Sequence, residues 1–186
     1  NAHPHHDQNK NFSLIHNGII ENHYSIKEYL IQKGIQFESD TDTEVLVQFI
    51  GYLYNTKKLS FYETVKLALQ EVIGTYGVVI MCKDEPEKLI AAKNGSPLLL
   101  GIGNDEFFLA SDVSAILDST RNILYLDDGE IVQLEKDSYK INHLNHEHEI
   151  IKDIKEIEYT LDQIEKGDYK HFMLKEIFEQ PKAMLE

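Results

Sequence analysis

The sequence contains a single cysteine, Cys82, no tryptophan and only four prolines among its 186 residues. One cysteine excludes an internal disulfide framework and fits a reducing compartment, so we expect a cytoplasmic protein. No apolar run approaches the length of about eighteen residues that a membrane helix needs. Basic residues are also scarce, since 18 Lys and Arg stand against 32 Asp and Glu, a net charge of −14. Nucleic-acid backbones and anionic membrane surfaces repel such a chain, so we expect neither as a partner.

Hydrophobic periodicity predicts helices first and strands afterwards. Apolar residues at helical spacing predict a helix over 24–33, and the pairs Thr41/Glu44 and Ser60/Glu63 are capping boxes that open two more. We also predict a brief strand over 36–38, one or two helical turns over 111–119 and a closing helix over 169–185. Seven short β-rich segments between them are separated by Gly, Asn, Asp and Pro, as is typical of antiparallel strands: YGVVIMCK, KLIAAKN, SPLLLGIG, EFFLAS, NILYLDD, GEIVQLE and YKINHL.

This order of elements predicts an α+β fold rather than a doubly wound parallel sheet. The segments 77–81 and 96–102 are apolar at nearly every position. Strands of that kind are covered on both faces, which predicts a sandwich of two antiparallel sheets with helices outside.

The stretch FSLIHNGIIEN, residues 12–22, is a short apolar run that meets the polar pair Asn17-Gly18. We expect a strand that ends at a corner there. Asn-Gly is a strong hairpin-turn signal, so one interpretation is a plain turn. The other is an oxyanion site made from the Asn17 amide and the Gly18 N–H. Asp42, at a capped helix start, similarly offers either helix-dipole stabilisation or a carboxylate for a cationic group. The residues alone leave both pairs of interpretations open.

Three other features favour ordinary structural roles. Cys82 ends an apolar segment with no histidine beside it, so we predict a buried, unreactive thiol. GIGND, residues 101–105, lacks the third glycine and the following helix of a dinucleotide loop, so we predict a hairpin turn and no cofactor. Two histidine groups lack acidic or thiolate companions at ligand spacing, so we predict no metal site. These groups are His3, His5 and His6, and His143, His146 and His148.

Several strings, taken in order, resemble one family: NAHPH, HNGIIEN, SDTDTEV, GTYGVVIM, GSPLLLGIG, FLASD and DYKHFMLKEIFEQP. They are similar to the glutaminase (class II glutamine amidotransferase) domains of glucosamine-6-phosphate synthases, over essentially the whole chain. The resemblance implies the N-terminal-nucleophile hydrolase fold, a four-layer α/β/β/α sandwich of two antiparallel sheets, here lacking its first strands. It divides the chain into an incomplete glutaminase domain, 1–165, and a linker or helix, 166–186, toward a sugar-isomerase domain.

Enzymes of this family are glutamine:fructose-6-phosphate transaminases (isomerising) of hexosamine synthesis. An N-terminal cysteine attacks the side-chain amide of L-glutamine, a γ-glutamyl thioester forms, and ammonia leaves for transfer to fructose-6-phosphate. The resemblance implies that Asn17 and Gly18 form the oxyanion hole and that Asp42 holds the α-amino group of glutamine. His3 and His16 match histidines that line the substrate site. The implied partners are the sugar-isomerase domain of the same polypeptide, with fructose-6-phosphate bound there, and further copies in a homo-oligomer.

The 186 residues depart from the family in two respects. They contain neither its nucleophilic cysteine nor its Arg-Trp-x-Thr-His motif, whose arginine binds the glutamine carboxylate. Asn1 cannot replace the nucleophile and Cys82 is not at its position, so we expect the chain alone to be inactive. The alternative is a degenerate, non-catalytic domain that binds glutamine or has a regulatory or subunit-contact role. A related amidotransferase of purine or asparagine synthesis is a third interpretation, which the tail string HFMLKEIFEQP disfavours.

Overall fold

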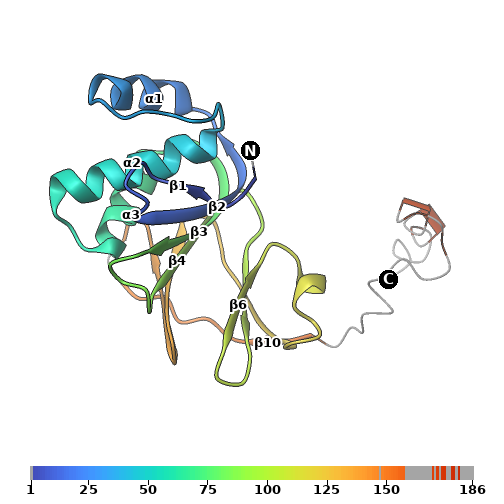
Figure 1. The fold of residues 1–186 in the computed structure, drawn as a ribbon. Helices are drawn as coiled ribbons and strands as arrows, with labels where there is room; N and C mark the ends of the chain where they lie inside the picture. The colour runs from blue at the N-terminus through green and yellow to red at the C-terminus, as the bar shows by residue number, and fades with distance from the viewer. Residues whose placement is uncertain are drawn as a thin grey trace.

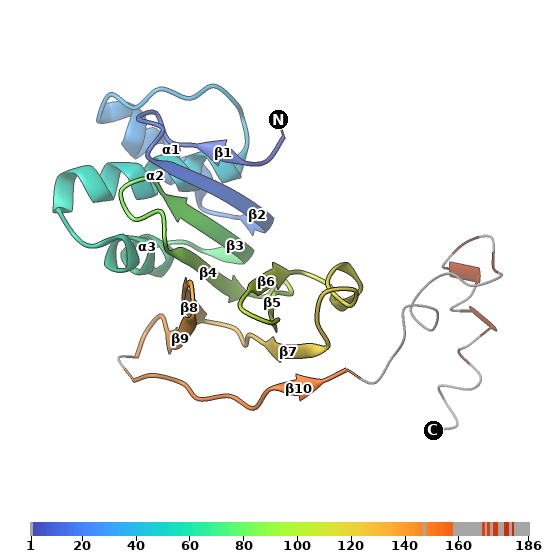
Figure 2. The same ribbon diagram turned by 60° about the horizontal axis from the view of Figure 1, so that its bottom comes forward.

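The computed structural model describes residues 2–146 and 148–157, and seven further positions beyond them (169, 171, 173, 174, 177, 178 and 180). In this part the chain is an α+β structure of two antiparallel sheets and three α-helices (Figures 1 and 2). The larger sheet has the strand order β1-β2-β3-β4-β8-β9 and the smaller one β10-β7-β5-β6. The predicted closing helix over 169–185 and the predicted linker, 166–186, fall largely outside the described residues.

Strands β2 to β9 match segments that the sequence predicts, whereas the two-residue strands β1 and β10 were not predicted. The larger sheet contains β1 (His5–His6), β2 (Phe12–Ile20), β3 (Gly74–Cys82), β4 (Leu89–Asn94), β8 (Glu130–Glu135) and β9 (Ser138–His143). The smaller sheet contains β5 (Leu99–Ile102), β6 (Phe107–Ala110), β7 (Asn122–Tyr125) and β10 (Lys155–Glu156). Every pairing within the two sheets is antiparallel, which confirms that prediction.

The three helices are α1 (His23–Gln32), α2 (Asp42–Lys57) and α3 (Phe61–Gln70), and a single 3-10 turn, η1, covers Val113–Ala115. Both predicted helix starts are confirmed, because the side chains of Thr41 and Ser60 each accept a hydrogen bond from the backbone three residues later. The strand predicted over 36–38 is wrong. The Glu38 N–H there donates to the side chain of Glu44, so this segment is a loop fixed by a helix and not by a neighbouring strand.

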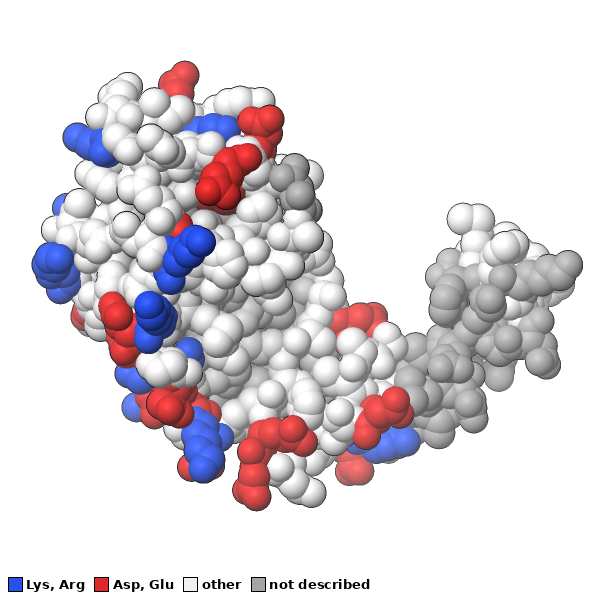
Figure 3. All heavy atoms as spheres, in the orientation of Figure 1, with Lys and Arg blue, Asp and Glu red and all other residues white. Residues whose placement is uncertain are grey.

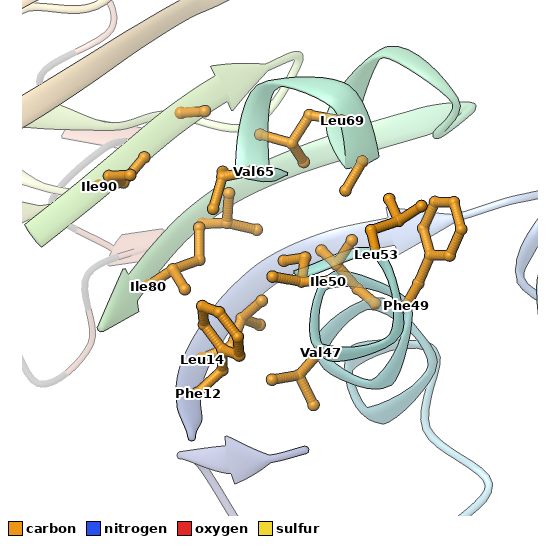
Figure 4. Packing of buried hydrophobic residues seen from close by; sticks show 14 of the residues in the cluster. Phe12, Leu14, Val47, Phe49, Ile50, Leu53, Val65, Leu69, Ile80 and Ile90 are labelled. Carbon is orange, nitrogen blue, oxygen red and sulfur yellow. The ribbon is translucent and has the colours of Figure 1, made fainter. Parts of the chain in front are cut away.

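The helices cover one face of the larger sheet, where they build the main hydrophobic core (Figure 4). Leu14 on β2 and Ile80 on β3 point from the sheet toward Ile50 on α2 and Val65 on α3, and all four are fully buried. Fully burying one such side chain contributes about 1.5–3 kcal/mol. The core therefore fixes β2 against α2, and these two elements carry His16, Asn17, Gly18 and Asp42.

The smaller sheet packs on the opposite face of the larger one. Leu100 and Leu124 meet Ala91 and Val132 in a second core, and Leu99 on the reverse side of β5 is buried under η1 in a third. Strand β5 is thus covered on both faces, as its apolar sequence predicts.

Strand β3 is covered only in part, because the smaller sheet lies over the β4–β8–β9 side of the larger sheet. Met81 is 51% exposed, and Ile15 and Ile19 on β2 are 45% and 66% exposed. We call the face of β2 and β3 that carries these three side chains the uncovered half of the larger sheet. Figure 3 shows a broad area without charged side chains over β2 to β4 and β6, with the charged residues gathered mainly along its rim. The prediction that 77–81 is covered on both faces is therefore wrong for Met81.

Two further expectations concern the loops and the membrane. Gly103 N–H donates to the Glu106 carbonyl at 2.9 Å between β5 and β6, so GIGND is the predicted hairpin turn. In the described part of the chain, none of the helices combines the length and the apolar character that crossing a membrane demands.

Candidate functional site

The pair Asn17-Gly18 lies inside a strand, and the predicted corner is wrong. Strand β2 pairs with β3 over its full length, with Asn17 opposite Gly77 and Gly18 opposite Tyr76. The Asn-Gly signal is local, whereas the pairing of nine consecutive residues with a distant strand stabilises the extended conformation. The plain hairpin interpretation is therefore excluded, and the glycine needs another explanation.

Gly18 allows the backbones of β2 and β3 to approach each other closely. Its φ of +142° belongs to a region that side chains disfavour, and a Cβ there would lie 2.1 Å from the Thr75 carbonyl oxygen. Gly74 has a φ of +133°, and a Cβ there would lie 2.2 Å from the Ile19 carbonyl oxygen. Each glycine therefore makes room for the backbone of the opposite strand, and this fixes where the Gly18 peptide sits.

Successive residues of β2 point to opposite faces of the sheet. Leu14 and His16 face the helices and are buried, whereas Ile15, Asn17 and Ile19 lie on the uncovered half. The Asn17 side chain is exposed and makes no hydrogen bond to another described residue. Its amide can therefore accept or donate to a ligand without breaking an internal contact.

His16 and Asp42 meet on the helical side of β2. The Asp42 Oδ2 accepts a hydrogen bond from the Ile20 N–H at 2.8 Å, and its Oδ1 lies 3.9 Å from His16 Nδ1. His16 Nδ1 also lies 3.1 Å from the Thr43 hydroxyl, while its buried Nε2 has no hydrogen-bond partner among the described residues. The first turn of α2 is thus tied to the end of β2 through both a backbone and a side-chain contact.

The charge state of His16 determines whether it neutralises Asp42. Burial lowers the pKa of His16 from its ordinary value of 6.5, and the Asp42 carboxylate opposes this shift only in part. His16 is therefore neutral near pH 7 and does not form an ion pair with Asp42. The carboxylate stays about one-fifth exposed, with a side-chain accessibility of 21%, so it can bind an external cation.

The edge of β2 beyond β1 is open in the described structure. Strand β1 pairs only with Ser13 and Leu14, and N–H groups along a strand alternate between its two edges. The Ile20 N–H points away from β3, because it donates to Asp42. The Gly18 N–H, two residues earlier, points to the same open edge. Along the strand it lies about 7 Å from the Ile20 N–H. A hydrogen-bond donor and a carboxylate are thus presented side by side on one edge.

His3 lies at the same edge. Besides burial, His3 contributes to the lowered pKa of His16, so the two rings lie near each other, and the ring of His3 is 5.6 Å from that of His5. A cavity of about 780 Å³ lies beside β1 and the loop before α2, and its lining includes His5 and Glu44 but neither Asn17 nor Asp42. The described residues therefore bring His3, His16, Asp42 and the Gly18 backbone together, with the Asn17 amide on the other face of the strand.

Cys82 is buried, as predicted, with 1% of its surface exposed. Burial raises the pKa of the Cys82 thiol, and the Asn11 amide nitrogen lies 3.8 Å from its sulfur. It lies at the end of β3 opposite Phe12, far along β2 from Gly18. Neither a thiolate nor access to the open edge is available to it.

Two contributors to the site were missed by sequence reasoning. The Ile20 N–H, which orients Asp42, is a backbone group with no sequence signal. Glu44 was predicted only as part of a capping box, yet it is 3% exposed and holds the loop before α2. Its position three residues after a threonine indicated the helix start. It did not indicate that the carboxylate accepts hydrogen bonds from the Glu38 and Ser39 N–H groups.

Comparison with known proteins identifies the family of this site. A family model described as a glutamine amidotransferase domain matches residues 1–118. The chain is 50% identical over 182 residues to the glutamine–fructose-6-phosphate aminotransferase (isomerizing) of Bacteroides thetaiotaomicron, over 97% of this chain and 30% of that protein. It is 47% identical over 184 residues to the protein of the same name from Fusobacterium nucleatum, over 99% of this chain and 30% of that protein. It spans about 30% of the length of these relatives.

Solved structures share the fold. The glutamine phosphoribosylpyrophosphate amidotransferase of B. subtilis, solved with ADP and GMP, has a TM-score of 0.65 at 25% identity, over 76% of this chain and 31% of that one. A structure described as the allosteric regulatory enzyme of purine biosynthesis also has a TM-score of 0.65, at 24% identity, over 77% of this chain and 31% of that one. The α+β structure is thus that of class II amidotransferase domains. With the family model matching 118 of 186 residues, the chain belongs to the glutamine amidotransferase domain family.

Proposed function

We propose that this chain is the glutaminase portion of a glucosamine-6-phosphate synthase. In this proposal the intact protein hydrolyses L-glutamine to glutamate and ammonia and transfers the ammonia to fructose-6-phosphate. The observation that carries the proposal is the open edge of β2, where the Gly18 N–H and the Asp42 carboxylate lie side by side. The chain is 50% and 47% identical to two aminotransferases of that name but 25% identical to the glutamine phosphoribosylpyrophosphate amidotransferase of B. subtilis. This difference favours the proposed specificity over that of the latter enzyme.

Each group suits one part of glutamine. The Asp42 carboxylate, which His16 does not neutralise, binds the α-ammonium group. The Gly18 N–H, together with the Asn17 amide, stabilises the oxyanion that develops when the side-chain amide is attacked. His3 and His16 line the site between them, and the lowered pKa of His16 keeps its ring neutral beside the substrate's cationic group.

The attacking atom comes from outside these 186 residues in this proposal. Cys82 is buried at the end of β3, opposite Phe12 at the start of β2, and no other thiol exists in the chain. The chain alone should therefore hydrolyse no glutamine, because without a nucleophile the thioester path does not exist. The alternative is a non-catalytic domain that keeps glutamine recognition or a subunit contact.

The same proposal includes the rest of the fold. Further strands would extend the open sheet edges at β1 and β6 and cover the uncovered half of the larger sheet, giving the four-layer α/β/β/α sandwich. We assign residues 1–165 to the glutaminase domain and 166–186 to the connection toward a sugar-isomerase domain, where fructose-6-phosphate binds. The intact protein would be a homo-oligomer, and one buried thiol fits the cytoplasm.

Substitution of Asn17 in the full-length gene product tests the proposal. Asn17→Ala should lower the glutaminase kcat by about 10²–10³ and leave the KM for glutamine nearly unchanged, because the amide acts on the oxyanion and not on the ground state. Ser13→Ala, on the same face of β2, is the matched control and should keep the wild-type kcat. An unaltered kcat in Asn17→Ala would refute the oxyanion role. Glutamine binding without any turnover in the wild-type gene product would favour the non-catalytic alternative.

A further inference from the structure

The glutamate in the first turn of α2 does not make the contact that its sequence pattern predicts. Thr41 Oγ1 accepts from the Glu44 N–H at 3.2 Å, but the Thr41 N–H donates to the Ser39 hydroxyl at 3.3 Å. At α3, by contrast, Ser60 and Glu63 form both halves of a capping box. The Glu44 carboxylate is therefore directed to a different partner.

That partner is the loop that leads into α2. Glu44 Oε1 accepts from the Glu38 N–H at 2.8 Å, and Oε2 accepts from the Ser39 N–H at 2.6 Å and from the Ser39 hydroxyl. Burial by itself would raise the pKa of Glu44, but these hydrogen bonds outweigh burial and lower it. The buried carboxylate thus stays charged and holds two consecutive backbone N–H groups.

The held loop ends at Asp42. Residues 38–41 enter the helix immediately before it, and the Asp42 carboxylate is fixed on its other side by the Ile20 N–H at 2.8 Å. Gln48 supports the same loop from the next helical turn through the Gln36 carbonyl at 3.3 Å. The direction of the Asp42 side chain therefore depends on two anchors, the end of β2 and the Glu44 carboxylate.

We propose that Glu44 is a positioning residue that holds Asp42 in the direction needed to bind the α-ammonium group of glutamine. The inference rests on the proposed role of Asp42. Glu44 itself does not touch the substrate. A carboxylate accepts from both N–H groups at once, whereas the amide introduced by Glu44→Gln would present an N–H to one of them. This substitution therefore releases one side of the loop, and Asp42 can turn away from the open edge.

Steady-state kinetics of the full-length gene product test this with two substrates, glutamine and glutaramate, which is glutamine without its α-amino group. Glu44→Gln should raise the KM for glutamine about tenfold, the lower end of what a hydrogen bond to a charged group contributes. Its kcat should stay within about twofold of wild type, because the contact is the same in ground and transition states. The KM for glutaramate should not change. Glu63→Gln alters the corresponding position of α3, away from the site, and should match wild type for both substrates.

Asp42→Asn and the double variant distinguish the substrate-binding role of Asp42 from the positioning role of Glu44. Asp42→Asn should raise the KM for glutamine at least as much as Glu44→Gln, and adding Glu44→Gln to it should have no further effect, because the two act through one contact. If Asp42→Asn changes the KM but Glu44→Gln does not, only the positioning role is overturned. If Asp42→Asn leaves the KM unchanged, the proposed function of Asp42 and the positioning role both fail. Additive effects, or a raised KM for glutaramate in Glu44→Gln, would show that Glu44 acts elsewhere and overturn the inference.

Discussion

Replacing Gly18 by alanine should destabilise the protein far more than a comparable change elsewhere. The new Cβ would lie 2.1 Å from the Thr75 carbonyl oxygen, 2.7 Å from the Thr75 carbonyl carbon and 2.9 Å from the Tyr76 Cα. All three are backbone atoms, so no side chain can rotate aside. Reaching even 3.0 Å requires β2 and β3 to separate locally by about 0.9 Å (3.0 minus 2.1).

Two terms contribute to the loss. A non-glycine residue at positive φ costs about 1–2 kcal/mol. Separating the strands weakens the neighbouring backbone hydrogen bonds, among them Glu21 N–H to the Ile73 carbonyl at 2.9 Å, and two such bonds contribute about 2 kcal/mol in total. We therefore expect Gly18→Ala to lower the free energy of unfolding by about 3–4 kcal/mol.

Gly34→Ala is the matched control, because Gly34 also has a positive φ, +85°, but nothing lies within 4 Å of its Cβ position. It should cost only the conformational term of about 1–2 kcal/mol. Differential scanning calorimetry of the full-length gene product should then show the Tm of this domain about 4–8 °C lower in Gly18→Ala than in Gly34→Ala. Two variants that melt within about 1 °C of each other would refute the close-approach argument.

Two further predictions concern buried side chains. His16 has a lowered pKa in the folded protein, so the unfolded chain binds its proton more readily and stability should fall as the pH drops through 6.5 toward the folded value. In urea unfolding from about pH 7.5 to 5.5, His16→Asn should reduce this slope, and equal slopes in wild type and His16→Asn would contradict the assignment. Cys82→Ala should leave the glutaminase activity of the full-length gene product unchanged, because the thiol is buried with a raised pKa. Loss of that activity at wild-type stability would show that Cys82 takes part in the reaction.

The elements that local signals specify were predictable from the sequence. The hydroxyl residues Thr41 and Ser60 set the starts of α2 and α3, because an N-cap needs only its own turn. The short strands β3 to β9 followed from β-rich segments separated by turn residues.

Features that depend on distant partners were not predictable. Asn17-Gly18 has the local signal of a turn but is extended, because β3 pairs with it from almost sixty residues away. Residues 36–38 have a strand-like composition but are held by Glu44. The exposure of Met81 depends on how far the smaller sheet extends over the larger one, which no single strand encodes.

Strand β2 serves both sides of the candidate site, since His16 faces the helices and Asn17 faces the uncovered half. A strand reverses the face of every later residue when one residue is inserted or deleted. A single insertion between Phe12 and His16 would therefore exchange the sides of His16 and Asn17 and move Gly18 away from Thr75. Attempts to alter substrate preference by protein engineering can thus vary the side chains of β2, but they must keep its length.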